Sequence, residues 1–335
     1  MAEKKALLVG GSGALGTYLI PALLKMDFKV DVLCLEDIIS NDPNLRYMNV
    51  DAKDVDVITE ILKNEYNVVV DFMLYFSAEE FSKYYNLYLD NTDHYVFLST
   101  YRIYADSFPI TEESPRLLDV STDQAFLNSG DYSIYKAQEE DMLRNSGYSN
   151  WTILRPAITY SKARFQLTIL EMPVIIYRML RGKTVVLPEQ ALDVQGTLSW
   201  AGDFATMVSR LILNPQAMKE TYTVSTSEHH TWREIAEIYG EIGGLKYVGA
   251  DTEDFLNIVN PGNIHTRQQL THDRFFNRVV DNTKILNHTG MKQSELMPLK
   301  QGLRMEFFGV PRLCKWEDYG MNARMDEYLE KHNIK

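Results

Sequence analysis

Short apolar runs alternate with amphipathic segments along the first half of the chain. The runs span four to six residues, a length typical of buried strands, and the segments between them repeat apolar residues every three or four positions, as helices do. Strands that alternate with helices indicate βαβ units and a parallel sheet. We therefore predict an α/β fold built on a Rossmann-type doubly wound sheet. The predicted strands are 6–9, 30–35, 46–50, 68–72, 95–98 and 151–156.

Amphipathic segments after the strands predict the helices of this sheet. The first begins near residue 15, and others are expected at 55–64, 78–89 and 131–145. Tyr and Phe recur at helical spacing within 78–89, a pattern more typical of core or of a subunit contact than of a cofactor site. The polar, proline-interrupted stretch 107–129 is predicted to be a loop or a lid.

Beyond residue 156 the pattern changes to helices that alternate with shorter strands. We predict a dinucleotide-binding domain over 1–160, a smaller C-terminal substrate lobe over 161–310 that interleaves with the last elements of the sheet, and a peripheral helical tail over 311–335. Residues 253–277 have weak periodicity and are predicted to be an adaptable loop. The predicted helices are 167–181, 203–213, 231–242, 281–290, 298–308 and 326–331, and the predicted strands are 184–187, 222–225 and 246–248.

A glycine cluster follows the first predicted strand and opens the first predicted helix. Glycines spaced as Gly10-x-x-Gly13-x-x-Gly16 let the backbone turn sharply and approach a ligand closely. Because a helix start offers free N–H groups and a positive dipole end, a pyrophosphate fits there. The alternative is a glycine turn that binds nothing. The candidate residues of this loop are Gly10, Ser12, Gly13, Ala14, Leu15 and Gly16.

An acidic residue ends the second predicted strand, near the distance at which dinucleotide sites hold a ribose. Glu36 lies twenty residues after Gly16, and a carboxylate there accepts a hydrogen bond from a ribose 2′-hydroxyl. A carboxylate also repels a 2′-phosphate, so Glu36 favours NAD over NADP. Two alternatives stay open: Glu36 is a solvated charge at a strand end, or Cys34 occupies the ribose position.

A tyrosine and a lysine lie four residues apart on the helix predicted at 131–145. Tyr132 and Lys136 therefore share one helical face, and an ammonium beside a phenol favours the phenolate form. Such a tyrosine exchanges a proton with a substrate hydroxyl or carbonyl, and the hydroxyl of Thr100, after the fifth predicted strand, is suited to hold the same oxygen. As an isolated spacing, however, the pair is more often found on an exposed helix surface.

Composition narrows the classes of partner. The formal net charge of −12 opposes nonspecific binding to nucleic acid and to anionic membranes. The two cysteines, Cys34 and Cys314, provide neither a disulfide framework nor a thiolate metal cluster, which fits a reducing cytoplasm. We see no signal peptide and no membrane-spanning stretch, and the adjacent His229 and His230 have poor spacing for a metal site. The acidic run 139–141 is predicted to be a solvated helix face.

Taken in order along the chain, these motifs resemble the extended short-chain dehydrogenase/reductase superfamily, and within it the NAD-dependent epimerase/dehydratase family. The resemblance covers residues 5–308. Each piece is weakly specific alone, and the resemblance rests on their joint order. The pieces are the glycine turn, Asp51 after the third predicted strand, and residues 99–104 (STYRIY), 132–136 (YSIYK), 154–160 (LRPAITY), 281–284 (DNTK) and 302–303 (GL).

The resemblance implies roles for individual residues. Tyr132 is the catalytic acid/base, Lys136 binds the nicotinamide ribose, and Thr100 holds the substrate oxygen. The glycines cradle the pyrophosphate. Four further residues match family positions that lie near the adenine, its ribose or the nicotinamide. They are Asp51, Ala52, Phe72 and Pro156.

The resemblance also implies a reaction. NAD is the expected cofactor, with NADP less favoured, and the expected chemistry is hydride transfer on a secondary alcohol or ketone of a small-molecule substrate. Epimerisation of a sugar nucleotide is the favoured form, and a dehydrogenase or reductase is the other. A homodimer is expected through the helices that carry residues 84–89 and 132–143.

Several positions depart from the family pattern. Val9 stands where Thr usually precedes the glycines. Residues 72–74 are Phe, Met and Leu in place of small residues, and these side chains are large enough to crowd or reshape the cofactor channel. Residues 101–102 are Tyr and Arg where dehydratases carry an acidic pair, which argues against dehydration.

An arginine that often binds the diphosphate in sugar-nucleotide enzymes is also missing. Gly196 occupies its usual place, seven residues before Asp203. This departure puts a sugar-nucleotide substrate in question. Arg274, Arg278 and His272 are candidate replacements, and plain surface charge is the alternative for these three residues.

A different class of function is the alternative to an enzyme. The chain also resembles a divergent subgroup of the same fold that includes chloroplast RNA-binding relatives, which often lack the catalytic tyrosine. In that case the protein is a non-catalytic dinucleotide-binding regulator or an RNA-associated protein. The joint presence of Thr100, Tyr132 and Lys136, together with the acidic net charge, favours an enzyme that does not bind nucleic acid.

Overall fold

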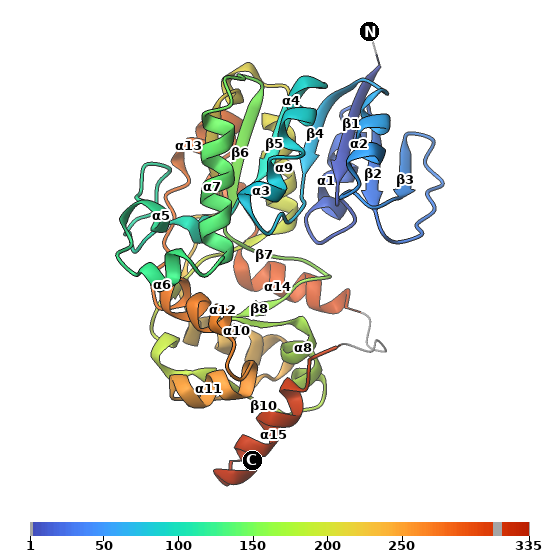
Figure 1. Ribbon diagram of the computed structural model, residues 1–335. Coiled ribbons are helices and arrows are strands. Elements are labelled where there is room, and N and C mark those ends of the chain that lie inside the picture. Colours follow the sequence, from blue (N-terminus) through green and yellow to red (C-terminus); the bar gives the residue numbers. More distant parts are fainter. Residues whose placement is uncertain (1–2, 311–316, 335) are drawn as a thin grey trace.

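The chain folds into two lobes that are stacked one above the other (Figure 1). The computed structural model describes residues 3–310 and 317–334. The described chain starts in the upper lobe and ends in a helix at the far end of the lower lobe. Residues 311–316 of the predicted tail, which include Cys314, lie outside the described residues.

A parallel sheet of seven strands forms the centre of the upper lobe. Its strand order is β13-β6-β5-β4-β1-β2-β3, so the sheet winds in both directions from the first strand. All six neighbouring pairs are parallel. The α/β doubly wound fold predicted from the apolar runs is therefore confirmed. The strands are β1 Lys4–Val9, β2 Phe28–Cys34, β3 Leu45–Asn49, β4 Tyr66–Asp71, β5 Thr92–Leu98, β6 Trp151–Pro156 and β13 Glu220–Val224.

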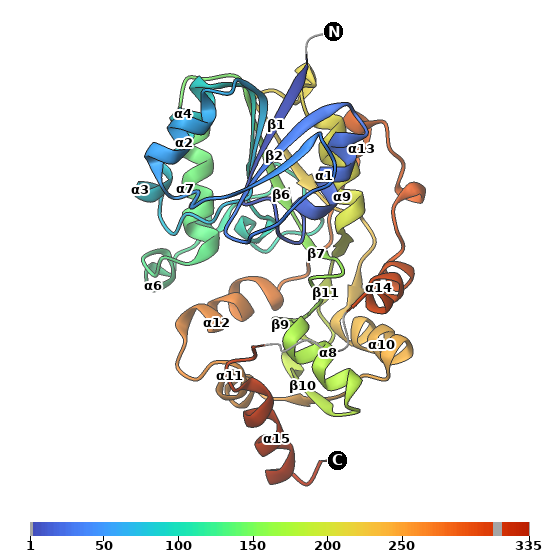
Figure 2. The same ribbon diagram turned by 90° about the vertical axis from the view of Figure 1, so that its right-hand side faces the viewer.

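Helices cover both faces of this sheet (Figure 2). Side chains alternate between the faces along β1: Ala6 and Leu8 join one hydrophobic core and Leu7 and Val9 join the other, and all four are fully buried. Burial on both faces explains why the strands are continuous apolar runs. The first face carries α1 Gly16–Leu24, α9 Ala201–Leu211 and α13 Thr283–Thr289, and the second carries α2 Val55–Leu62, α3 Ala78–Phe81, α4 Tyr85–Asp90 and α7 Tyr132–Arg144.

The lower lobe has its own hydrophobic core, formed by helices and by short strand pairs. Its parallel pair β10–β15 lies in the same core as α8 and α10. The helices are α8 Met172–Leu180, α10 Trp232–Gly243, α11 Thr252–Val259, α12 Ile264–Gln269, α14 Leu299–Phe308 and α15 Met321–Lys331. The strands are β7 Ile158–Tyr160, β8 Gln166–Leu167, β9 Leu170–Glu171, β10 Thr184–Pro188, β11 Gln195–Gly196, β12 Leu198–Trp200, β14 His230–Thr231 and β15 Lys246–Ala250.

The prediction of an adaptable loop over 253–277 was wrong. This region consists of α11, α12 and a π-helical turn, Leu270–Arg274. The side chain of Asp251 accepts hydrogen bonds from two backbone N–H groups at the start of α11, and Asn263 does the same for one at the start of α12. The segments are too short for a clear helical period, so their caps were the available sequence signal.

Two further segments differ from their predicted form. The helix predicted over 78–89 is divided into α3 and α4, and the loop predicted over 107–129 contains α5 Leu117–Val120 and α6 Gln124–Leu127. Tyr84 and Tyr88 are buried, and their rings lie 5.0 Å from Tyr75 and 5.3 Å from Tyr95 between centroids. Phe81, Tyr84 and Tyr88 are therefore core residues, and Tyr85 is half-buried against the same core. The large exposed hydrophobic residues among those described include none from 84–89 or from α7, so the homodimer stays a prediction.

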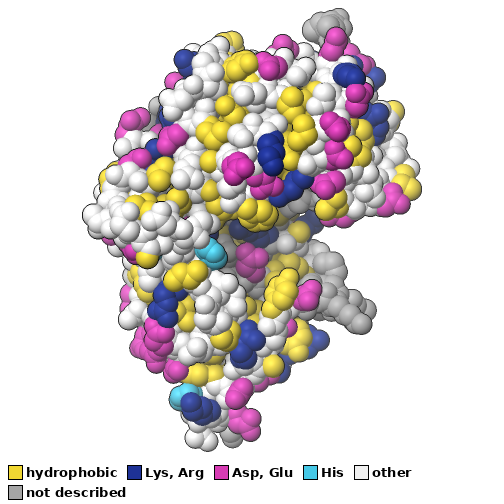
Figure 3. Space-filling view, in the orientation of Figure 1, with side chains coloured by type: hydrophobic (Ala, Val, Ile, Leu, Met, Phe, Trp, Pro, Cys, Tyr) yellow, Lys and Arg dark blue, Asp and Glu magenta, His cyan; other side chains and the backbone are white. Residues whose placement is uncertain are grey.

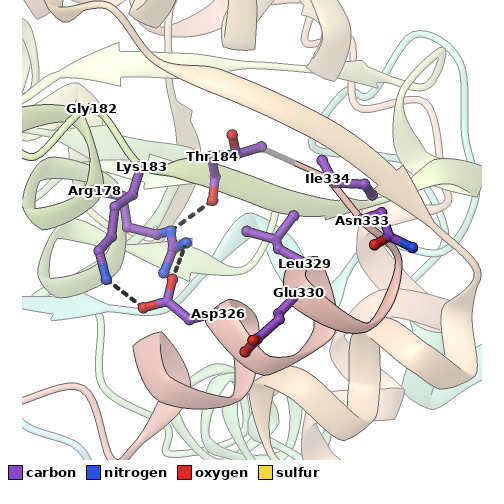
Figure 4. A pocket seen from close by; sticks show the side chains of 9 residues that line it. All are labelled: Arg178, Gly182, Lys183, Thr184, Asp326, Leu329, Glu330, Asn333 and Ile334. Carbon is purple, nitrogen blue, oxygen red and sulfur yellow. Dashed lines mark hydrogen bonds and ion pairs between the residues drawn. The ribbon is translucent and has the colours of Figure 1, made fainter.

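The C-terminal helix α15 is longer than predicted, and one of its faces packs against the lower lobe at the far end of the molecule. Met325 is fully buried, and its sulfur accepts a hydrogen bond from the backbone N–H of Val186 at 3.3 Å. Arg178, also fully buried, donates to Asp326 at 2.7 Å, and Lys183 forms an ion pair with the same carboxylate (Figure 4). Apolar burial and a shared carboxylate thus anchor the helix.

The described residues contain neither a helix that could span a membrane nor a cluster of metal ligands. No helix in them combines the length and the apolar character needed to cross a membrane. The same ranges contain no group of three His, Cys, Asp or Glu side chains arranged to hold a metal ion.

We predict that Met325→Ala lowers the free energy of unfolding by about 2 to 5 kcal/mol, because it leaves a cavity in the core of the lower lobe. Urea unfolding measures this loss. Glu327→Ala, on the exposed side of the same helix, is the matched control and should leave stability unchanged. Equal midpoints for the two variants would contradict the anchoring of α15.

Candidate active site

Two cavities lie at the carboxyl ends of the sheet strands, where doubly wound folds bind ligands. The first cavity, of about 260 Å³, is lined by Gly10, Ser12, Met73 and the segments 33–36 and 50–53. The second cavity, of about 430 Å³, lies between the lobes, and Figure 3 shows that the molecule is hollowed there. Its upper wall includes Leu15, Phe72, Thr100, Tyr132 and Pro156, and its lower wall includes Arg164, Gln166, Glu171, Gln269 and Arg274.

The glycine loop is compact because two of its glycines have steric reasons to be glycine. Gly10 has φ of 72°, in the left-handed region that side chains disfavour. A Cβ on Gly16 would overlap the carbonyl oxygen of Gly11, so the start of α1 packs directly on the loop. Gly13 is exposed with open space around it, and Ala14 is half-buried beside it. The turn at Gly13 therefore leaves room for a ligand just before α1.

The predicted ribose-binding carboxylate lies beside this loop. Glu36 is exposed, lines the first cavity, and accepts a hydrogen bond from the hydroxyl of Ser12 at 2.9 Å. The Cys34 thiol lines the same cavity and donates to the backbone carbonyl of Glu36 at 3.3 Å. Asp51 and Ala52 approach from the β3–α2 connection. Predicted cofactor residues from three separate chain segments thus line the first cavity together with Met73, and their binding of a cofactor stays a prediction.

Thr100 and Tyr132 both line the second cavity. Thr100 caps a short 3₁₀ turn, Tyr101–Ile103, where its hydroxyl oxygen accepts from the backbone N–H of Arg102 at 3.2 Å. This bond leaves the hydroxyl hydrogen free to donate to a ligand. Tyr132 is the first residue of α7, and the carboxylate of Asp131 caps that helix by accepting from the N–H of Ser133 at 2.8 Å.

Lys136 does not reach either cavity. Its side chain is fully buried, and its ammonium lies 2.9 Å from a carboxylate oxygen of Glu139 and 4.5 Å from the ring centroid of Phe97. It also donates to the backbone carbonyl of Met73 at 3.4 Å. The cation that lies over the Tyr132 ring is instead Arg102, whose guanidinium carbon is 5.3 Å from the ring centroid.

The partners of Lys136 belong to a buried cluster of charged and phenolic groups. Asp71, fully buried, accepts hydrogen bonds from the hydroxyl groups of Tyr95 at 2.7 Å and Tyr75 at 3.0 Å. Burial raises the pKa of Asp71, and it raises the pKa of Glu139 to about 7 even though Lys136 acts to lower it. Lys136 thus supplies one positive charge to the buried region between α7 and the sheet that holds the carboxyl groups of Asp71 and Glu139.

The prediction that residues 139–141 form a solvated helix face was therefore wrong for Glu139 and Glu140, which are both fully buried. Glu140 receives two hydrogen bonds from Arg155, at 2.9 Å and 2.6 Å, and this cation lowers the pKa of Glu140 although burial alone would raise it. The pair joins the end of β6 to α7.

Arg274 and Arg278 are buried residues rather than surface charge. Arg274 lines the second cavity, donates to the carbonyl of Thr168 at 2.8 Å, and forms an ion pair with Asp273. Burial lowers the pKa of both arginines to about 10. Arg278 donates to Asp273 at 2.9 Å and does not line the cavity.

His272 stacks on Phe126. Gly196, which stands at the position of the missing arginine, is closely packed. The ring centroids of His272 and Phe126 are 3.9 Å apart, and His272 does not line the cavity either. A Cβ on Gly196 would lie 2.9 Å from the buried ring of Trp232, so an arginine at that position would displace the ring. The guanidinium of Arg274 lies 5.7 Å from the centroid of the same ring and supplies positive charge to this region from another segment.

Sequence reasoning missed Arg102, Arg164 and Gln166 as residues of the second cavity. Arg102 is 15% exposed and lies 3.5 Å from Asp273 and 3.7 Å from Asp131 without a side-chain hydrogen bond to either. Arg102 stands two residues after Thr100, which was a usable signal. Arg164 and Gln166 enter through the connection between the lobes, which no local pattern indicates.

We predict that Lys136→Met destabilises the fold by about 3 to 5 kcal/mol, because it leaves the buried carboxylates of Glu139 and Asp71 without their cation. The control is Lys63→Met, which removes an exposed lysine paired with Glu60 at the same i,i+3 spacing and should change stability little. Chemical denaturation of both variants measures the difference. A loss as small as that of the control would mean that Lys136 is not held in the cluster.

Comparison with known proteins supports the architecture. No protein-family model matches the sequence, and no curated protein matches it significantly. Among solved structures, the epimerase Mth375 of Methanothermobacter thermautotrophicus matches with a TM-score of 0.71 at 13% identity, over 98% of this chain and 95% of that one. Thermus thermophilus UDP-glucose 4-epimerase in complex with NAD gives 0.66 at 17% identity, over 92% and 100%.

A dehydratase has a comparable likeness. The dTDP-glucose 4,6-dehydratase of Bacillus anthracis, in complex with NAD, gives a TM-score of 0.68 at 16% identity, over 91% of this chain and 99% of that one. The similarity thus spans both lobes and does not separate epimerases from dehydratases. The chain has the fold of these epimerases and dehydratases, the extended short-chain dehydrogenase/reductase fold that its motifs resemble.

Proposed function

We propose that this protein is an NAD-dependent oxidoreductase or epimerase that acts on a secondary alcohol or ketone. The observation that carries the proposal is that Thr100 and Tyr132, which come from different elements, line one cavity at the carboxyl ends of the strands. Pro156 and Leu15 line the same cavity, so its wall includes the residue of the loop that directly precedes α1. This is the arrangement that acid/base catalysis next to a bound dinucleotide requires.

The residues of the first cavity fit the adenosine half of NAD. The open turn around Gly13, just before α1, is suited to the pyrophosphate, and Glu36 is suited to accept from the ribose hydroxyl groups. Because the Glu36 carboxylate would repel a 2′-phosphate, we infer that NAD is preferred to NADP. When bound, NAD supplies the acceptor for the hydride. Two of the similar structures carry NAD, which is consistent with this assignment.

The proton of the substrate hydroxyl is handled by this chain's own side chains. Tyr132 exchanges that proton with the substrate oxygen, and the Thr100 hydroxyl donates to the same oxygen as negative charge develops on it. Arg102, over the Tyr132 ring, adds a positive charge to the wall of the cavity. With NAD bound, the same two side chains would serve either epimerisation or net oxidation or reduction, because both reactions need proton exchange at the substrate oxygen.

We infer that the substrate carries an anionic group, and a sugar nucleotide is our first candidate. Arg102, Arg164 and Arg274 line the second cavity with one carboxylate, Glu171, in the same wall. The similar epimerase and dehydratase are named for UDP-glucose and dTDP-glucose. Arg274 takes the role of the arginine missing at Gly196. Residues 101–102 offer no acid after Thr100, so we favour epimerisation or simple redox chemistry over dehydration.

We predict that Tyr132→Phe reduces turnover about 10²- to 10⁴-fold while the Kd for NADH is unchanged, because only the exchangeable proton is removed. Denaturing the purified protein and identifying the released small molecules by mass spectrometry gives the substrate to assay, with UDP-glucose as the first to try. Tyr319→Phe, at an exposed position in the described C-terminal segment, is the control. Full turnover by Tyr132→Phe would refute the mechanism.

A non-catalytic dinucleotide-binding regulator is the second candidate, and the burial of Lys136 away from both cavities is the observation that favours it. It requires partner binding that depends on NAD and is indifferent to Tyr132→Phe. Filter binding with RNA at physiological salt tests its RNA-associated form. The cytoplasmic location and the homodimer stay predictions from the sequence.

A further inference from the structure

The side chain of Met73 lies directly on the glycine loop. Its sulfur is 3.0 Å from the position that a Cβ would take on Gly10, the residue with φ of 72°. Met73 also lines the first cavity. The thioether therefore covers the backbone face of Gly10, at the beginning of the turn that leads to α1.

Met73 belongs to a three-residue segment that separates the two cavities. Phe72 and Leu74 line the second cavity, whereas Met73 lines the first. A dinucleotide places its pyrophosphate at the glycine loop and one nucleoside on each side of it. A ligand that occupies both cavities must therefore cross this segment next to Gly10, and the Met73 side chain stands on that path.

The buried charged cluster holds the backbone of this segment in place. The N–H of Met73 donates to the carboxylate of Asp71 at 2.9 Å, and its carbonyl accepts from the ammonium of Lys136 at 3.4 Å. Asp71 and Lys136 are both fully buried. Since the backbone is held at both polar groups, the side chain is the part of Met73 that can give way. Methionine is unbranched and changes rotamer readily.

We propose that Met73 sets the affinity of this protein for a dinucleotide, because its side chain must leave Gly10 before a pyrophosphate can pass between the two cavities. This inference rests on the proposed function. Part of the free energy of dinucleotide binding is used to displace the thioether. The apparent affinity for the whole dinucleotide is therefore lower than it would be if the groove beside Gly10 were open. A mononucleotide, which fills the first cavity alone, has no such displacement to make.

The test compares two ligands on the full-length protein and three variants. NADH and AMP are titrated separately by calorimetry against wild type, Met73→Ala, Met73→Leu and Met305→Ala. Met73→Leu keeps an apolar side chain of similar volume, and Met305, exposed on α14, is a control methionine that lines neither cavity. Thermal unfolding of each variant, together with retained AMP binding, establishes that the first cavity is intact.

The expected result is that Met73→Ala binds NADH about tenfold more tightly than wild type, with the Kd for AMP unchanged. Met305→Ala should bind both ligands as wild type does, and Met73→Leu, which keeps the volume in a branched and less adaptable side chain, should bind NADH no more tightly than wild type. The inference would also be supported if Met73→Ala bound NADH detectably while wild type and the other two variants did not.

Two results overturn the inference and leave the proposed function standing. One is an equal NADH affinity in wild type and Met73→Ala, and the other is an equal gain for AMP, which would mean that Met73 merely occupies the first cavity. Failure of wild type and every variant to bind NADH or AMP would overturn the proposed function and this inference with it.

Discussion

The buried ion pair between Arg155 and Glu140 is the interaction on which the site depends. Arg155 is 2% exposed and Glu140 is fully buried, so neither charge has water to replace its partner. Arg155 also donates to the hydroxyl of Tyr104 at 2.9 Å, and that hydroxyl pairs with Thr223 at 2.7 Å. One guanidinium thus connects the end of β6, helix α7, the 3₁₀ turn after Thr100 and strand β13. The elements that carry the catalytic candidates cannot shift independently.

Charge is distributed unevenly in the molecule. The chain as a whole is acidic, with a formal net charge of −12, yet the wall of the second cavity carries Arg102, Arg164 and Arg274 against Glu171. Positive groups inside an otherwise negative protein concentrate an anionic ligand in one place and discourage its adsorption elsewhere. Arg274 is buried and paired with Asp273, so its charge is fixed in place at the cavity wall.

Local patterns predicted the parts of the structure whose causes are local. The strand 151–156 and the glycine loop followed from apolar runs and from the conformational freedom of Gly10, and the cavity around Glu36 followed from the parallel order of the strands. The helices of 252–274 were missed because they depend on caps and on packing more than on a visible period. The spacing of Tyr132 and Lys136 predicted that they share one helix, but it could not predict the surroundings of the flexible Lys136 side chain. Those surroundings depend on Asp71 and Glu139, and Asp71 becomes a neighbour of Lys136 only in the folded chain.

The position of strand β13 has a consequence for the order of assembly during synthesis. Strand β6 ends at Pro156, and its outer neighbour β13 begins at Glu220, so much of the lower lobe is translated between these two strands. A ribosome that has released β6 but not β13 therefore holds a nascent sheet with one edge unpaired, and exposed edges of this kind invite wrong pairing. The helix α13, at 283–289, emerges later still. The lobe that is translated first is thus among the last parts of the molecule to be finished.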